Sequence, residues 1–190
     1  GIYWGVRSFD GDGDSRLVNC GFALSWSEVK DMERKYCVHP ANVFVDAGDR
    51  KDEILAACAT HGWTATRGDQ RNEFPWKVQT PMGIKIEMRP YSTPVVETIA
   101  GKRVKLFYFS NLRLKDVLSM MIKKGRHTRP SDVPAEYVEQ MQSERRTITA
   151  NGKPIWEQIA SRPNHFFDVE TILTLAAVAW KLTGRVGALI

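Results

Sequence analysis

An aspartate at the entrance to the most apolar predicted helix constrains this chain more than any other feature. Asp168 closes the segment 162–168 and directly precedes the apolar run 169–182. A carboxylate is costly to bury there unless a cation neutralises it, and a divalent metal ion does so effectively. The alternative is an ordinary first-turn carboxylate that interacts with the helix dipole.

A second aspartate stands at the end of a predicted strand. Asp46 follows the apolar residues 43–45 and precedes Ala47 and Gly48. Ligands collect beyond the carboxyl ends of parallel strands, so this position suits a ligand-binding side chain. A plain turn residue is the alternative. Together, Asp46 and Asp168 predict metal-dependent chemistry on a polyanion.

Composition is consistent with a polyanionic partner. The chain has 190 residues and a formal net charge of +5, which suits one domain, residues 1–190, with its own core. A basic surface kept only for solubility is the alternative reading. The three cysteines form no CxxC pair, which argues against a zinc ribbon or a disulfide framework. The longest apolar run, 172–180, is too short to cross a bilayer, so no membrane partner is expected.

The order of predicted elements indicates an α/β fold. Strands and helices alternate, which favours a mixed β-sheet flanked by helices. Helices are predicted at 25–36, 51–61, 111–124, 136–143 and from about 166 to Gly184. Strands are predicted at 2–9, 16–26, 43–46, 63–67, 76–79, 84–88, 103–109 and 145–149.

The acidic turn between the first two strands admits three interpretations. Asp10, Asp12 and Asp14 begin like a calcium loop, but Ser15 and Gly21 stand where that loop needs a glycine and a glutamate. A hairpin turn rich in Asp and Gly is the second interpretation. The third is that Asp10, or else Asp12, is a metal ligand at the end of the first strand.

Several segments resemble the nuclease domain of the large terminase subunit of tailed bacteriophages, the motor that packages and cuts viral DNA. The similarity spans nearly the whole chain, and the Asn-His-x-x-Asp segment before the last helix is its most specific part. The segments are 43–48, 63–68, 107–118 with its lysine-bearing helix, 137–145 with Gln140 and Glu144, and 163–168 ahead of Ala176 and Ala177.

This resemblance implies an RNase H-like fold, with a mixed β-sheet flanked by helices on both faces. It also implies three acidic residues that hold two Mg²⁺ or Mn²⁺ ions for hydrolysis of phosphodiesters. Asp46 and Asp168 match the family's second and third acidic positions. Arg7 stands where the first is expected. Either Asp10 or Asp12 replaces that acid, or the metal-binding set is incomplete.

The resemblance implies a metal-dependent DNA endonuclease domain of a viral packaging terminase, in the host cell cytoplasm. Its partners would be double-stranded DNA, the terminase ATPase domain, the small terminase subunit and the portal. No GxxxxGK[ST] motif occurs, so the ATPase domain is expected to lie outside this chain. The alternatives are another RNase H-like nuclease, such as a resolvase, and a non-catalytic DNA-binding or docking module.

Basic residues are the candidates for DNA phosphate contacts, which are largely independent of sequence. The basic loop 125–134 is the candidate for a DNA-facing flap, with a solvated surface loop as the alternative. His127 and His165 are candidates for proton transfer. The expected phosphate-binding residues are Lys51, Arg67, Arg71, Lys123, Lys124, Arg126 and Arg129.

Overall fold

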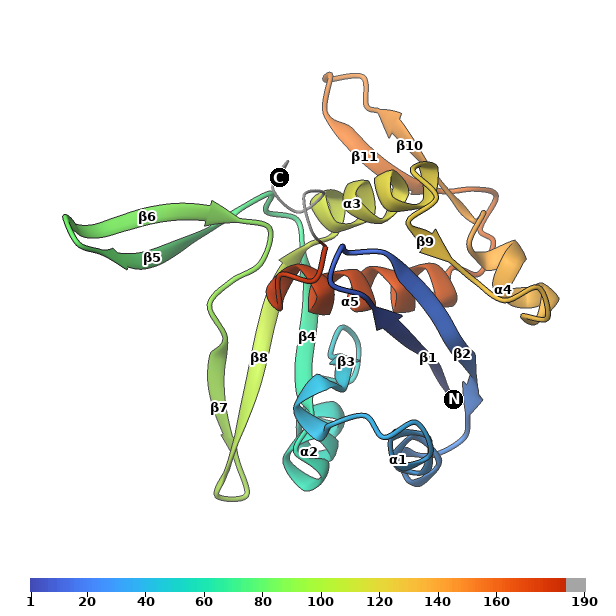
Figure 1. Cartoon of the computed structure of the whole chain (residues 1–190), viewed down its shortest axis with the longest axis horizontal. Coiled ribbons are helices and arrows are strands. Elements are labelled where there is room, and N and C mark those ends of the chain that lie inside the picture. The colour runs from blue at the N-terminus through green and yellow to red at the C-terminus, as the bar shows by residue number, and fades with distance from the viewer. Residues whose placement is uncertain (184–190) are drawn as a thin grey trace.

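Eleven strands and five α-helices follow one another along residues 1–183, the part of the chain that the computed structural model describes (Figure 1). This arrangement confirms the predicted α/β class. The helices are α1 (Trp26–Lys35), α2 (Lys51–His61), α3 (Asn111–Lys123), α4 (Ala135–Gln140) and α5 (His165–Ala179).

The largest sheet has the strand order β3-β4-β8-β7. Strands β3 (Phe44–Asp46), β4 (Thr64–Asp69) and β8 (Lys102–Ser110) are parallel to one another, whereas β7 (Val95–Ile99) is antiparallel to β8. The carboxyl ends of the three parallel strands therefore meet at one edge of a mixed sheet.

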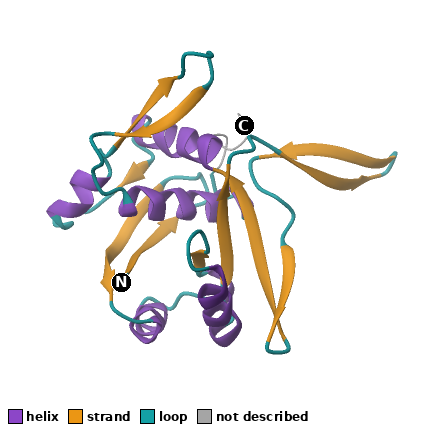
Figure 2. Ribbon diagram, turned by 180° about the vertical axis from the view of Figure 1, so that it is seen from behind, coloured by secondary structure: helices purple, strands orange, loops and turns teal. Residues whose placement is uncertain are grey.

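Helices cover both faces of this sheet (Figure 2). Alternating residues of β8 explain how, since successive strand side chains point to opposite faces. Leu106 belongs to a core cluster that includes Leu55 of α2. Phe107 belongs instead to a cluster with Leu114 of α3 and Leu175 of α5. The two cores fix the sheet between α2 on one side and the α3–α5 pair on the other.

The first hairpin forms a separate sheet. Strand β1 (Ile2–Phe9) pairs with β2 (Ser15–Ala23), which pairs in parallel with the short β9 (His127–Thr128). Strand β1 packs closely on α5 at Gly5, where an added Cβ would lie 3.0 Å from Val169. Helix α5 thus contacts both β1 and β3.

The predicted mixed sheet is present as β3-β4-β8-β7, and the first strand, β1, lies outside it. Strands β1 and β3 are not paired; both instead line a cavity of about 640 Å³, together with residues of α1 and α5. Wide aromatic side chains, including Trp4 and Trp26, line this cavity. The space between the two strands is thus a cavity and not a ladder of hydrogen bonds.

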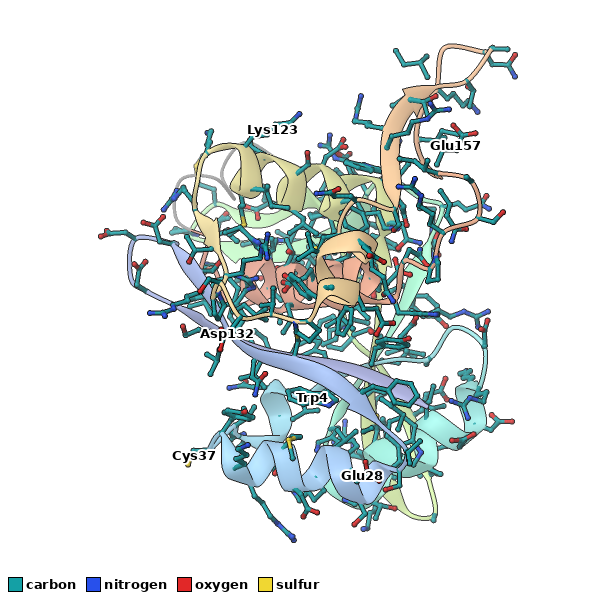
Figure 3. All side chains as sticks on the ribbon, turned by 90° about the vertical axis from the view of Figure 1, so that its right-hand side faces the viewer. Trp4, Glu28, Cys37, Lys123, Asp132 and Glu157 are labelled. Carbon is teal, nitrogen blue, oxygen red and sulfur yellow. The ribbon has the colours of Figure 1, made fainter. Side chains whose placement is uncertain are left out.

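Two further hairpins project from the body. Strands β5 (Phe74–Thr80) and β6 (Gly83–Arg89) form one of them, on the left in Figure 1. Strands β10 (Glu144–Ile148) and β11 (Pro154–Gln158) form the other. In Figure 3, Glu157 marks this second hairpin beyond the end of the helical layer.

Most predicted elements are present, with shifts at their ends. Helix α1 begins after Ser25, whose hydroxyl accepts from the Glu28 N–H, as expected of a capping box. Strands β7, β9 and β11 were not predicted. Helix α5 ends at Ala179, earlier than predicted, and Lys181 adopts a left-handed φ of 59° that a helix does not allow. The predicted end at Gly184 lies outside the described residues.

None of the helices within residues 1–183 is both long and apolar enough to cross a membrane.

Candidate metal and nucleic-acid site

Asp46 ends β3 at the edge where the parallel strands finish. The backbone holds it there, because the Ala47 N–H donates to the Thr66 carbonyl at 2.7 Å. The Gly48 N–H donates to Asp46 Oδ1 at 3.1 Å and orients the carboxylate. Asp46 remains exposed on this edge. The structure therefore presents its carboxylate to a ligand.

Asp168 lies in the first turn of α5 and lines the same cavity as Asp46. Its Oδ1 is 3.0 Å from Lys115 Nζ, and 43% of its side chain is exposed. The Asp168 carboxylate is therefore accessible to solvent while it forms an ion pair with Lys115. The second carboxylate of the sequence prediction thus lines the same cavity as the first.

Lys115 also holds a third carboxylate. Its Nζ lies 2.7 and 2.9 Å from the two oxygens of Glu144, at the start of β10. Asn164, which precedes α5, donates to Glu144 Oε1 at 2.7 Å. The side chains of Lys115 and Glu144 are 9% and 4% exposed. These ion pairs and this hydrogen bond connect α3, the start of β10 and the N-terminal end of α5 next to Asp168.

The surroundings of the two aspartates favour their neutral forms. Although Asp46 still reaches solvent, partial desolvation by the surrounding protein raises its pKa, and the neighbouring Asp168 raises it further. Burial likewise raises the pKa of Asp168, although the Lys115 ammonium opposes this shift. Each carboxylate therefore resists ionisation more than a free side chain, and a nearby cation would oppose this shift in its pKa.

Arg7 does not direct its charge at these carboxylates. Its Nε and Nη2 each donate to Glu170 at 2.9 Å, and its Nη1 donates to Ser15 Oγ and to the Thr128 carbonyl. Tyr137 Oη also donates to Glu170, at 2.8 Å. The guanidinium is therefore neutralised in a buried cluster on α5 instead of repelling a cation at Asp46.

Asp10 and Asp12 stay in the β1–β2 turn. Asp10 Oδ1 accepts from the backbone N–H groups of Asp12 and Asp14, at 3.0 and 2.9 Å. This is the role of a turn-forming side chain. Asp46 and Asp168 share the lining of one cavity, which includes neither Asp10 nor Asp12.

The candidate phosphate-binding residues differ in how they are engaged. Lys51, Arg71 and Arg126 are each paired with a carboxylate, those of Glu97, Asp69 and Asp14 respectively. Arg67 is exposed on β4 and close enough to Asp46 to lower its pKa. Lys123, Lys124 and Arg129 are exposed around the end of α3 and the loop after it.

The two candidate histidines lie in different surroundings. His127 Nε2 is 3.0 Å from Glu170 Oε2, inside the buried Arg7 cluster. The ring of His165 stacks on Tyr3 with centroids 4.5 Å apart, and His165 lines the cavity that holds Asp168. Of the two, His165 is therefore the one near the aspartates.

Sequence reasoning assigned no role to Lys115, Glu144 or Glu170. A lysine-bearing helix and Glu144 were part of the resemblance, and that was the only available signal for the first two. Glu170 stands inside an apolar helix, two residues after Asp168. A lone glutamate at such a position signals a buried cationic partner, which the structure identifies as Arg7.

The carboxylates fit a divalent cation in part. Asp46 and Asp168 supply the hard oxygen donors that Mg²⁺ prefers. Within residues 1–183, however, no group of three or more His, Cys, Asp or Glu side chains comes together as a metal-holding set. The pair suits one ion, whereas a two-ion centre needs a further carboxylate that this arrangement does not bring in.

Comparison with known proteins identified one family. A family model described as "Terminase large subunit gpA, endonuclease domain" matches residues 23–186. The comparisons with curated proteins and with solved structures returned no match.

Proposed function

This chain belongs to the family of terminase large subunit gpA endonuclease domains, and we propose that it is a metal-dependent DNA endonuclease domain that cuts concatemeric viral DNA during genome packaging. The observation that carries the proposal is the pairing of Asp46 and Asp168 at one cavity. Their raised pKa values support a cation at that position.

Asp46 and Asp168 would hold the metal, which is Mg²⁺ or Mn²⁺. When bound, such an ion activates water and stabilises the leaving oxygen of a phosphodiester. The chain's own groups prepare the site. The Gly48 N–H orients Asp46. Lys115 fixes Asp168 and keeps the buried Glu144 neutralised. Arg67 stands beside Asp46 and would hold a DNA phosphate.

A two-ion centre and an RNase H-like arrangement remain part of the proposal. The order of hairpin, helix, strand, helix and strand fits that fold, as does the contact of α5 with both β1 and β3. A second ion would need Asp10 or Asp12 to move from the β1–β2 turn. The proposed partners are duplex DNA, the terminase ATPase domain, the small subunit and the portal, in the host cytoplasm.

A non-catalytic DNA-binding or docking module is the second candidate function. The observation that favours it is Arg7, which stands at the position of the family's first acid and is bound by Glu170. In that case Asp46 and Asp168 would be remnants of a lost site, and the domain would bind no divalent cation there.

Calorimetric titration of the chain with Mn²⁺ distinguishes the two functions without a measurement of DNA cutting. The endonuclease proposal predicts binding to the wild-type chain that is lost in Asp46→Asn and in Asp168→Asn. Asp10→Asn and Asp12→Asn then decide whether the turn supplies a further ligand. Equal Mn²⁺ binding by the wild type and both site variants would refute the proposed metal site.

A further inference from the structure

The β5–β6 hairpin leaves the body of the molecule as a two-stranded arm (Figure 1). Its base is anchored, since Phe74 is buried and Trp76 Nε1 donates to the Tyr91 carbonyl at 2.7 Å. Beyond that base the strands pair only with each other, up to Thr80 opposite Gly83. An isolated two-stranded hairpin is marginally stable in water, so an arm of this kind is expected to have a binding partner.

One face of the arm is apolar and exposed. Ile84, Ile86 and Met88 alternate along β6 and are 68%, 62% and 51% exposed, and Met82 at the tip is fully exposed. Scattered apolar residues on a surface need no explanation, but a row along one face of a projecting hairpin does.

Positive charge accompanies this apolar row. Within residues 74–89, Lys77, Lys85 and Arg89 outnumber the single acid Glu87. Lys77 is the cross-strand neighbour of Ile86, so it lies on the apolar face itself. A face that mixes lysine with Ile and Met suits a polyanion with apolar surface between its charges, as in a DNA groove.

The arm starts at the sheet edge that carries Asp46. Strand β4 passes from Arg67, beside Asp46, into the turn that precedes β5. At the base of the arm, the Arg71 guanidinium lies 4.5 Å from the Phe74 ring and that of Arg89 lies 4.3 Å from the Trp76 ring. DNA held at Asp46 would therefore meet basic groups in the direction of the arm.

We propose that the β5–β6 hairpin is a DNA-gripping arm that lays its apolar face, with Met82 at its tip, into a groove of the duplex. This rests on the proposed function, because it takes DNA as the substrate. A DNA groove admits a two-stranded β-ribbon, and Ile and Met side chains on such ribbons contact thymine methyl groups or wedge between base steps. Lys77, which lies on that face, neutralises a flanking phosphate.

The test is the affinity of the chain for a fluorescent duplex of about 25 base pairs, measured by anisotropy in EDTA so that no cutting occurs. The double variant Ile84→Thr/Ile86→Thr keeps β-branched side chains and removes the apolar surface. We expect it to bind at least about five-fold more weakly, because the variant removes apolar surface that the groove would bury. The matched control is Ile148→Thr/Ile155→Thr on the other hairpin, also exposed, which should stay within about two-fold.

Lys77→Gln gives an independent readout. Loss of one phosphate contact should lower the slope of log affinity against log salt by about 1. Unchanged affinity in the β6 double variant, or an equal loss in both hairpin variants, would overturn the proposal. If the wild type cuts no DNA but the arm variant still binds more weakly, the arm stands and the endonuclease function fails. If cutting occurs and affinity is unaffected by the arm variants, only the arm proposal fails.

Discussion

Arg7 and Glu170 form an ion pair from which water is almost excluded, with Nε 2.9 Å from Oε2 and each side chain 1% exposed. The pair connects β1 to α5, and α5 also carries Asp168 two residues before Glu170. Arg7 stands where the family's first acidic residue is expected. Through Glu170 it holds α5, the helix that also carries Asp168. Arg7 is therefore compatible with a cation at Asp46 and Asp168.

Removal of the charge of Glu170 should destabilise the fold strongly. Glu170→Gln leaves the Arg7 guanidinium buried without its counter-charge, which typically costs about 3 to 5 kcal/mol. Guanidinium unfolding measures this loss. Glu53→Gln is the control, because its pair with Arg50 is about half exposed and should cost less than about 1 kcal/mol.

The stabilisation that Glu170 provides should depend on pH. The His127 and Arg7 partners outweigh burial and lower the pKa of Glu170 to about 2. A lowered pKa stabilises the fold above the pKa of the unfolded chain, about 4.3, and this stabilisation is lost as the pH falls toward 2. The difference in unfolding free energy between wild type and Glu170→Gln should therefore shrink between pH 5 and pH 2.5, and a difference independent of pH would contradict the assignment.

Asp46→Asn should not lower the stability of the metal-free protein. A raised pKa means that ionisation of Asp46 costs the fold stability as the pH rises past the pKa of the unfolded chain. In EDTA at pH 7 the melting temperature should therefore stay the same or rise. Asp69→Asn is the opposite control, since the Arg71 guanidinium lowers the pKa of Asp69 and its loss should lower the melting temperature. A marked drop in Asp46→Asn would indicate a structural carboxylate.

Lys115 should show strong coupling to Glu144. Lys115→Met leaves a buried glutamate without its cation and should cost several kcal/mol, whereas Lys115→Met/Glu144→Gln should recover most of that loss. DNA cutting should remain low in the double variant, because Asp168 still lacks its lysine. Unfolding free energies and cutting rates of the four proteins of this cycle provide the measurement; recovery of both properties together would show that Lys115 serves stability alone.

Arg67 should matter more for DNA than Arg126. Arg67 is exposed beside Asp46, whereas Arg126 donates to Asp14 at 2.6 Å in the β1–β2 turn. Arg67→Gln should weaken duplex binding in EDTA and lower its salt slope by about 1, as loss of one phosphate contact does. Arg126→Gln should change neither quantity appreciably. A larger loss of affinity in Arg126→Gln than in Arg67→Gln would indicate that DNA binds near the β1–β2 turn instead.

The sequence predicted those parts of the molecule that depend on local pattern. The bounds of α2 and the Ser25 cap of α1 follow from composition and spacing. The positions of Asp46 and Asp168 at element ends follow from the switch between apolar and acidic residues.

Contacts across long sequence separations were beyond such reasoning. Lys115 and Glu144 are 29 residues apart, and Arg7 and Glu170 are 163 apart. Their pairing depends on how the helices pack, which no periodicity encodes. The separation of β1 from β3 is of the same kind, because it depends on a cavity that is lined by residues of β1, β3, α1 and α5.

Cutting of supercoiled plasmid by the purified chain tests the central claim most directly. The reactions contain Mn²⁺, Mg²⁺ or EDTA, with Asp168→Asn beside the wild type and Asp31→Asn, an exposed carboxylate of α1 that does not line the cavity, as a matched control. The account predicts nicked and linear products with either metal, none with EDTA, and loss of cutting in Asp168→Asn while Asp31→Asn stays active. Equal cutting by wild type and Asp168→Asn, or none by the wild type with either metal, would contradict it.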